Sequence, residues 1–159
     1  MPDLTQYLTL GLDQDLFGID IQHVHEILDM RPISGLPQAP AFLLGMIDVR
    51  GAGYPVVDLR LKLGLPRAAP TPLTRIVILN VAIGGRHTGV GFVADRVLEV
   101  TTFDDARLEP APEVGGRWRS DYIAGIGRRN GGFVVVFDIE RLMSADGNVL
   151  AASVKAAAA

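Results

Sequence analysis

The three histidines are the first candidates for chemistry, because an imidazole can bind a metal ion or carry a proton near neutral pH. His23 and His25 are two positions apart and would share one face of a strand, whereas His87 lies far away in the sequence. A zinc site needs three or four protein ligands, and the chain contains no cysteine. Because no full ligand set is visible, we expect no metal and interpret these histidines as surface or polar-core residues.

A glycine-rich run has the spacing of a nucleotide-binding loop. Gly89, Gly91 and Ala94 form G-x-G-x-x-A, a pattern whose glycines let a pyrophosphate approach the N-terminus of a helix. However, Phe92 and Val93 favour a strand at this position. Without a following helix the pattern has no phosphate site, so we expect no cofactor.

Catalytic nucleophiles and acid pairs are not evident either. No serine stands in G-x-S-x-G, the motif that exposes a nucleophile. Asp13 and Asp15 fall in a polar turn, where aspartate commonly binds backbone N–H groups and solvent. Asp58 and Asp138 each follow an apolar run, where we expect them to cap the next turn. We therefore predict no catalytic residue and no enzyme activity.

Length and charge narrow the remaining functions. The chain has 159 residues, which fits one compact domain or two small lobes with a shared core. Its 15 basic and 18 acidic residues give a net charge of -3 and form no basic run, so we expect no nucleic acid partner. No apolar segment is long enough to span a bilayer, and we expect a cytoplasmic protein without direct membrane insertion.

Short apolar runs separated by glycine and proline predict mostly β structure. The expected strands are 7–12 with 16–21, 76–81 with 88–94, and 133–137. Short helices are expected at Gln22–Leu28, near Pro40–Leu44 and at Ile139–Ser144. The alanine-rich tail, 151–159, is expected to be disordered.

An internal repeat divides the chain into two similar halves. Gly18, Val24, Glu26 and Ile27 recur 73 positions later as Gly91, Val97, Glu99 and Val100. Gly45, Gly51, Val56, Asp58 and Leu59 recur 80 positions later as Gly125, Gly131, Val136, Asp138 and Ile139. About five short strands per half favour a small closed barrel, because closure removes exposed sheet edges. We predict two barrels side by side, with a binding surface in the groove between them.

Many blocks of the sequence, taken in order, resemble the CheW family of chemotaxis coupling proteins. The blocks include Phe17-Gly18-Ile19-Asp20-Ile21, Val24-His25-Glu26-Ile27-Leu28, Asp48-Val49-Arg50-Gly51, Pro55-Val56-Val57-Asp58-Leu59, Gly91-Phe92-Val93-Ala94-Asp95, and Asp138-Ile139-Glu140-Arg141-Leu142. The resemblance covers about residues 5 to 145. It implies an all-β fold of two pseudo-symmetric, five-stranded, SH3-like barrels packed side by side, with short helices.

The same resemblance implies a function and a domain plan. The protein would be a non-enzymatic adaptor that links the cytoplasmic tip of methyl-accepting chemoreceptors to the regulatory domain of the histidine kinase CheA. We expect a single CheW-like domain over 1–150. Lobe one would cover about 1–66 with a contribution from 139–150, and lobe two about 67–138. A small-ligand or nucleotide-binding barrel, or a coupling protein of a non-motility pathway, remain alternatives.

Six residues are expected to contact the receptor. They are Val24, Glu26, Ile27, Arg50, Val97 and Val100. The four apolar residues are the repeat-related positions expected near the groove, although ordinary core packing would also explain some of them. The resemblance associates Arg50 with receptor coupling, and Glu26 is its natural partner. Such a pair could either shape the groove or contact the receptor directly.

Five glycines are expected to form structural turns. They are Gly45, Gly51, Gly91, Gly125 and Gly131. The sequence departs from the family pattern at Asp48, where Asn is usual in Asn-Leu-Arg-Gly. It also departs in the loop from Gly115 to Arg119, whose Trp118 could be a contact element or a half-buried lid on the core.

Overall fold

The computed structural model describes residues 5–83, 85–105, 107–110 and 122–144, and these residues are mainly in strands. The elements are β1 (Tyr7–Leu12), β2 (Asp15–Asp20), η1 (Ile21–His23), β3 (Val24–Asp29), β4 (Leu43–Val49), β5 (Ala52–Asp58), α1 (Leu59–Lys62), β6 (Arg75–Ile83), β7 (Arg86–Ala94), β8 (Arg96–Thr101), β9 (Ile123–Arg129), β10 (Gly132–Phe137) and α2 (Ile139–Ser144). Both predicted hairpins, the strand at 133–137 and the helix at 139–144 are confirmed.

Two predicted helices are wrong. The segment 22–28 contains only the last two residues of the single turn η1, and its remainder is β3, which pairs with β6. Position 40–44 holds a turn and the beginning of β4. In both places apolar and β-branched residues gain more from pairing with a neighbouring strand than from an isolated helical turn.

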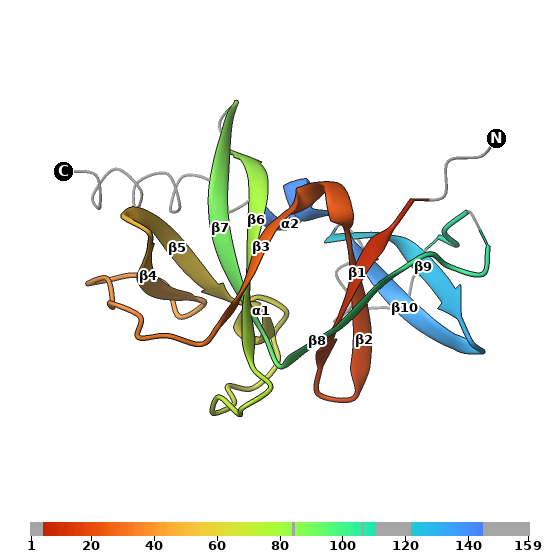
Figure 1. Cartoon of the computed structure of the whole chain (residues 1–159), viewed down its shortest axis with the longest axis horizontal. Coiled ribbons are helices and arrows are strands. Elements are labelled where there is room, and N and C mark those ends of the chain that lie inside the picture. Colours follow the sequence, from red (N-terminus) through yellow and green to blue (C-terminus); the bar gives the residue numbers. More distant parts are fainter. Residues whose placement is uncertain (1–4, 84, 106, 111–121, 145–159) are drawn as a thin grey trace.

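The strands form two five-stranded sheets that lie side by side (Figure 1). The first barrel has the order β8-β1-β2-β10-β9 and the second has β3-β6-β7-β5-β4. In each sheet an isolated bridge pairs one edge strand with the segment that follows the opposite edge strand. Ile126 of β9 pairs with Glu109, beyond β8, in the first barrel, and Met46 of β4 pairs with Ser34, beyond β3, in the second. This closure confirms the predicted fold of two small five-stranded barrels.

The strand order confirms the internal repeat and corrects the expected lobe boundaries. Each strand of β1–β5 is equivalent to the strand five places later, and exchanging every such pair converts one strand order into the other. In the parallel pairs, Gly18 lies opposite Val136 and Gly91 lies opposite Val56. Each half of the chain therefore contributes its first hairpin to one barrel and its other three strands to the other. The expected division near residue 66 is wrong, because a repeat shows which segments are equivalent but not which copy they pair with.

The largest apolar core lies between the barrels. It includes Leu8, Leu10 and Ile19 of the first barrel, Val77 and Leu79 of the second, and the buried side of α2: Ile139, Leu142 and Met143. Each barrel also has a smaller cluster of its own. The hairpin strands alternate between these cores, as the period-two pattern requires. Among the described residues, no helix has the length and apolar character needed to span a lipid bilayer.

Three of the five glycines expected in turns lie inside strands instead. Gly51 and Gly131 occupy hairpin turns with φ of +85° and +79°. Gly45, Gly91 and Gly125 belong to β4, β7 and β9, so the turn prediction is wrong for them. In these strands the missing side chain matters because another chain segment approaches closely. A Cβ at position 125 would lie 2.6 Å from Cβ of Leu108, beside the bridge that closes the first barrel.

Some predictions fall on residues that the structure does not describe. The loop Gly115–Arg119, with Trp118, lies outside the described residues, and so do the tail 151–159 and the last part of the segment 139–150.

Candidate functional site

Strand β3 positions three of the six predicted contact residues. Val24 and Ile27 lie opposite Leu79 and Val77 of β6. Directly opposed residues point to the same side of an antiparallel pair, and Leu79 and Val77 belong to the core between the barrels. Both β3 side chains therefore point toward the inter-barrel side. Val24 is partly buried against that core, whereas Ile27 is 42% exposed.

Strand β8 repeats this arrangement in the first barrel. Val97 and Val100 lie opposite Leu10 and Leu8, which are members of the same inter-barrel core. Val97 packs partly buried against the core, and Val100 is 47% exposed. The interpretation as core packing thus fits Val24 and Val97, while their repeat-related neighbours Ile27 and Val100 remain available to a partner.

A bulge in each strand turns the intervening glutamate away from this apolar side. In β3 the register shifts between Val24 and Glu26, and β8 shifts in the same place relative to β1. An extra residue re-aims the side chains that follow it. In the first barrel Thr9 fills the bulge, because its Oγ1 donates to the Glu99 carbonyl at 2.8 Å and accepts from the Glu99 N–H at 3.2 Å.

Arg50 lies at the tip of the β4–β5 hairpin and reaches across to Glu26. Its φ is +51° and that of Gly51 is +85°, the positive pair that a two-residue hairpin turn requires. The carboxylate of Asp48 accepts a hydrogen bond from the Gly51 N–H at 2.8 Å. An asparagine carbonyl would serve equally well as acceptor, so the departure from the family pattern at position 48 keeps this turn.

The expected contact between Arg50 and Glu26 is present and is bidentate. Arg50 Nη1 donates to Glu26 Oε1 at 2.9 Å, and Nη2 donates to Oε2 at 2.5 Å. The Arg50 side chain is 70% exposed and that of Glu26 is 26% exposed. The hydrogen bonds from Arg50 lower the pKa of the Glu26 carboxyl, and those to Glu26 raise the pKa of Arg50. The forked geometry fixes an exposed guanidinium in one orientation.

The repeat-related glutamate has a weaker partner. Glu99 Oε1 lies 3.5 Å from Nη2 of Arg129 at the end of β9. The repeat counterpart of Arg50 is Asn130, which has the same positive φ in its turn. The two barrels therefore present similar apolar positions but different charged groups beside them.

Comparison with known proteins identifies this arrangement. The family model for the CheW-like domain matches residues 6–147. The chain belongs to the CheW-like domain family. A protein of Rhizobium etli named "Probable chemotaxis protein CheW" is 32% identical over 132 residues, covering 83% of this chain and 82% of that protein. The chemotaxis protein CheW of Klebsiella aerogenes is 29% identical over 141 residues, covering 89% and 82%.

A solved structure of the CheW-like family has the same fold. The crystal structure of the scaffolding protein TtCheW from Thermoanaerobacter tengcongensis matches with a TM-score of 0.79 and 27% identity, covering 92% of each chain. This match agrees with the two-barrel architecture.

A groove between the barrels exists, but the six predicted residues do not line it. A cavity of about 400 Å³ lies between the first barrel and the segment that follows β5 in the second. Its walls include Phe17 and Val135 on one side and Leu61 and Leu65 on the other. The predicted contact residues are instead distributed along β3, β8 and the β4–β5 turn of this CheW-like chain.

The glycine-rich run and the histidines, candidates for phosphate and metal binding, lie in the second barrel and its surroundings as follows. Gly89, Gly91 and Ala94 lie within the single strand β7, so no helix N-terminus follows the glycines. His25 and His87 line a small cavity of about 210 Å³ with Tyr54 and Asn80. Within the described part of the chain, no three His, Cys, Asp or Glu side chains gather as metal ligands would.

One polar contact was not predicted from the sequence. Asp13, interpreted there as a solvated turn residue, contacts the buried Arg60. Asp58 and Asp138 do cap the following turns, since their Oδ1 atoms accept from the N–H groups of Arg60 and Arg141.

Proposed function

We propose that this protein is the coupling scaffold of a bacterial chemotaxis-type signalling complex, in which it joins the cytoplasmic tip of a chemoreceptor to the regulatory domain of a CheA-type histidine kinase. Its relatives named CheW are chemotaxis proteins, and the matching solved structure is that of a scaffolding protein. The protein works by binding in the cytoplasm and transforms no substrate.

The residues assigned to receptor contact are Ile27 and Val100, on the inter-barrel side, and the Arg50–Glu26 pair, which the bulge in β3 turns away from that side. Together they are called the receptor face. A receptor tip is a helical hairpin, and a helix binds a surface through apolar contacts with polar groups at the rim. Ile27 and Val100 supply exposed apolar area on the inter-barrel side of each barrel. The observation that carries the proposal is the exposed guanidinium of Arg50, held in a fixed orientation by two hydrogen bonds.

Replacing Arg50 by glutamine tests this face. We expect Arg50→Gln to weaken binding of a receptor cytoplasmic fragment by about tenfold, since the substitution removes a charged, forked hydrogen-bond donor from the contact face. The melting temperature should change little, because the side chain is mainly exposed. Arg128→Gln is the matched control: Arg128 is also an exposed arginine paired with a glutamate, Glu109, but on the first barrel. The proposal would be contradicted if Arg50→Gln and Arg128→Gln bound the receptor fragment equally well. It would also be contradicted if Arg50→Gln lost binding only because it unfolds.

A charge exchange distinguishes the two roles of the pair. The double variant Glu26→Arg/Arg50→Glu keeps opposite charges at the two positions. If Arg50 acts only by holding the surface in shape, the exchange should restore most of the binding. If Arg50 contacts the receptor, the exchange should remain as weak as Arg50→Gln, and this is the result we expect. Isothermal titration with the same receptor fragment measures both.

The kinase contact is tested separately. We expect the full chain to co-purify with the regulatory domain of a CheA-type kinase, and Arg50→Gln to retain that binding. Failure of the unmodified chain to bind either the kinase domain or the receptor fragment would remove the proposed function.

A further inference from the structure

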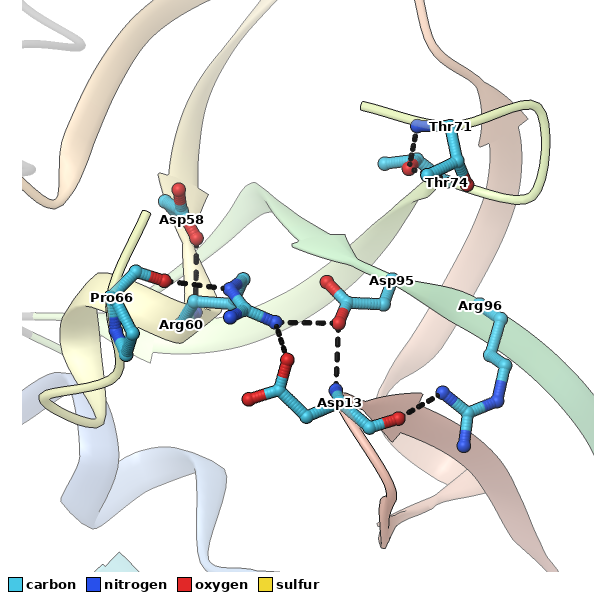
Figure 2. A network of polar contacts seen from close by, with 8 residues as sticks. All are labelled: Asp13, Asp58, Arg60, Pro66, Thr71, Thr74, Asp95 and Arg96. Carbon is cyan, nitrogen blue, oxygen red and sulfur yellow. Dashed lines mark hydrogen bonds and ion pairs between the residues drawn. The ribbon is translucent and has the colours of Figure 1, made fainter. Parts of the chain in front are cut away.

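A buried arginine connects three segments where the two barrels meet (Figure 2). Arg60, in α1, has a side chain that is only 8% exposed. Its Nη1 donates to Oδ1 of Asp13 and to Oδ2 of Asp95, each at 2.6 Å. Its Nε donates to the Pro66 carbonyl at 2.8 Å. The hydrogen bond to Asp13 raises the pKa of the Arg60 guanidinium.

The three charged residues come from different parts of the architecture. Arg60 follows β5 and belongs to the second barrel. Asp13 lies in the β1–β2 turn of the first barrel. Asp95 is the single residue between β7 of the second barrel and β8 of the first, and it also accepts a hydrogen bond from the Asp13 N–H at 2.7 Å. The cluster of Asp13, Arg60 and Asp95, or inter-barrel lock, thus connects the two barrels at a point where the chain passes from one to the other.

The lock lies at the beginning of the strand that carries one half of the receptor face. Asp95 immediately precedes β8, which carries Val97 and Val100, while Val24 and Ile27 stand on β3 of the other barrel. A partner that contacts both strands therefore requires one defined placement of the barrels. The apolar core between them is large, but hydrophobic contact is non-directional. In this cluster the guanidinium of Arg60 is buried, whereas the side chains of Asp13 and Asp95 are 50% and 28% exposed. The buried guanidinium keeps its hydrogen bonds to both carboxylates only in one arrangement of the segments that carry them.

We propose that Asp13, Arg60 and Asp95 are positioning residues that set the placement of the barrels and so align the two halves of the receptor face. This inference rests on the proposed function, because it concerns the same face. The apolar core holds the barrels together, and the inter-barrel lock selects one orientation among those the core would allow.

The decisive variant removes the charges without leaving one buried alone. Removing one partner of a buried ion pair destabilises a protein strongly, whereas replacing the whole cluster is often neutral. The whole cluster is replaced in the triple variant Asp13→Asn/Arg60→Met/Asp95→Asn. Asn suits position 13, where φ is +53°. Arg128→Met is the control, since Arg128 pairs with Glu109 within the first barrel. If the triple variant does not fold, Asp95→Asn alone, which leaves Asp13 to pair with Arg60, replaces it.

The first measurement is the distance between the barrels. The chain has no cysteine, so spin labels attach only at introduced positions. Ala82→Cys on the second barrel and Ala124→Cys on the first place labels at exposed alanines. Pulsed electron paramagnetic resonance should give one narrow distance in the otherwise unmodified chain and in Arg128→Met. It should give a broader or shifted distribution in the triple variant.

The second measurement is receptor binding by the unlabelled variants. If the unlocked chain has its barrels correctly placed about a tenth of the time, the apparent Kd for the receptor fragment rises about tenfold. A folded triple variant with an unchanged distance distribution overturns the inference, and so does a changed distribution with unchanged binding. If the unmodified chain does not bind the fragment, the proposed function fails, while the distance measurement still decides whether the lock orients the barrels.

Discussion

Replacing Gly45 by alanine should open the second barrel at its closing bridge. Gly45 has a φ of +148°, and an added Cβ would overlap the Ser34 carbonyl oxygen and lie 2.7 Å from its carbonyl carbon. Ser34 exchanges two backbone hydrogen bonds with Met46, of 2.9 and 2.8 Å. Displacing the Ser34 carbonyl would break both bonds. Their loss costs about 2 kcal/mol, and the positive φ costs an alanine about 1–3 kcal/mol. We therefore expect a loss of roughly 3–5 kcal/mol in the free energy of unfolding.

Urea denaturation and a thermal melt measure this loss. For a chain of this size, it corresponds to a fall in Tm of roughly 6–20 °C. Gly35→Ala is the matched control, because position 35 is next to the bridge and an added Cβ would meet nothing within 4 Å. Gly125→Ala should also destabilise the fold, but less than Gly45→Ala, because an added Cβ there would lie 2.9 Å from the Glu109 carbonyl oxygen at the equivalent bridge and φ is not positive. Equal stability of Gly45→Ala and Gly35→Ala would refute the assignment of Gly45 to barrel closure.

Two further predictions concern charged groups. Because Arg50 lowers the pKa of Glu26 below its ordinary 4.5, the ion pair should persist at neutral pH and be lost only as the pH falls through that lowered pKa. An NMR titration of the Glu26 carboxyl group should show protonation at this lowered pKa. In Arg50→Gln the pKa of Glu26 should return toward its ordinary value. If the Glu26 pKa does not respond to this substitution, the pair is not formed in solution. Asp58→Ala should lower the free energy of unfolding by about 1–2 kcal/mol through loss of the cap on α1, more than Asp138→Ala, because Asp58 is buried and Asp138 is not. Urea denaturation compares the two, and an equal cost would show that burial of the cap is irrelevant.

The strand pattern and the repeat were accessible from the sequence because both depend on local features. Alternation in 7–12 and the uninterrupted apolar run at 133–137 identify strands wherever those strands pair. The sequence does not show in the same way which strands pair with each other. The strand β3, for example, would bury the same side chains against either hairpin. The short links between consecutive strands determine which barrel each strand joins. Asp95 alone links β7 to β8, so β8 passes directly into the first barrel.

The helix expected at 22–28 shows a second limit. Val24, Ile27 and Leu28 have the i, i+3, i+4 spacing of one helix face, and the same segment alternates only imperfectly as a strand. The imperfection is the bulge beside Val24, where the register with β6 shifts. A bulge is not visible as a period of two in sequence, because it interrupts that period.

The sequence predicted only part of the candidate site, because contacts between distant segments leave no local pattern. Glu26 and Arg50 stand in two motifs of the resemblance, and opposite charge suggested their contact, which the structure contains. Arg60 is separated from Asp13 by 47 positions and from Asp95 by 35. Neither spacing corresponds to a helix, a hairpin or a repeat. Such a cluster follows from the tertiary arrangement and has no local sequence signal.

The repeat makes the differences between its halves informative about function. Asp13, Arg60 and Asp95 have Arg86, Glu140 and Gln22 as repeat counterparts, and Arg50 has Asn130. The apolar positions of the two barrels agree, as do Glu26 with Glu99 and Asp58 with Asp138, but these other charged positions do not. A symmetric protein would offer two equal faces and could not distinguish two different partners. Unequal charges around similar apolar surfaces allow each partner to be attracted by one face and rejected by the other. A scaffold that joins two different proteins requires that inequality, so we expect its specificity to reside in the residues that break the repeat.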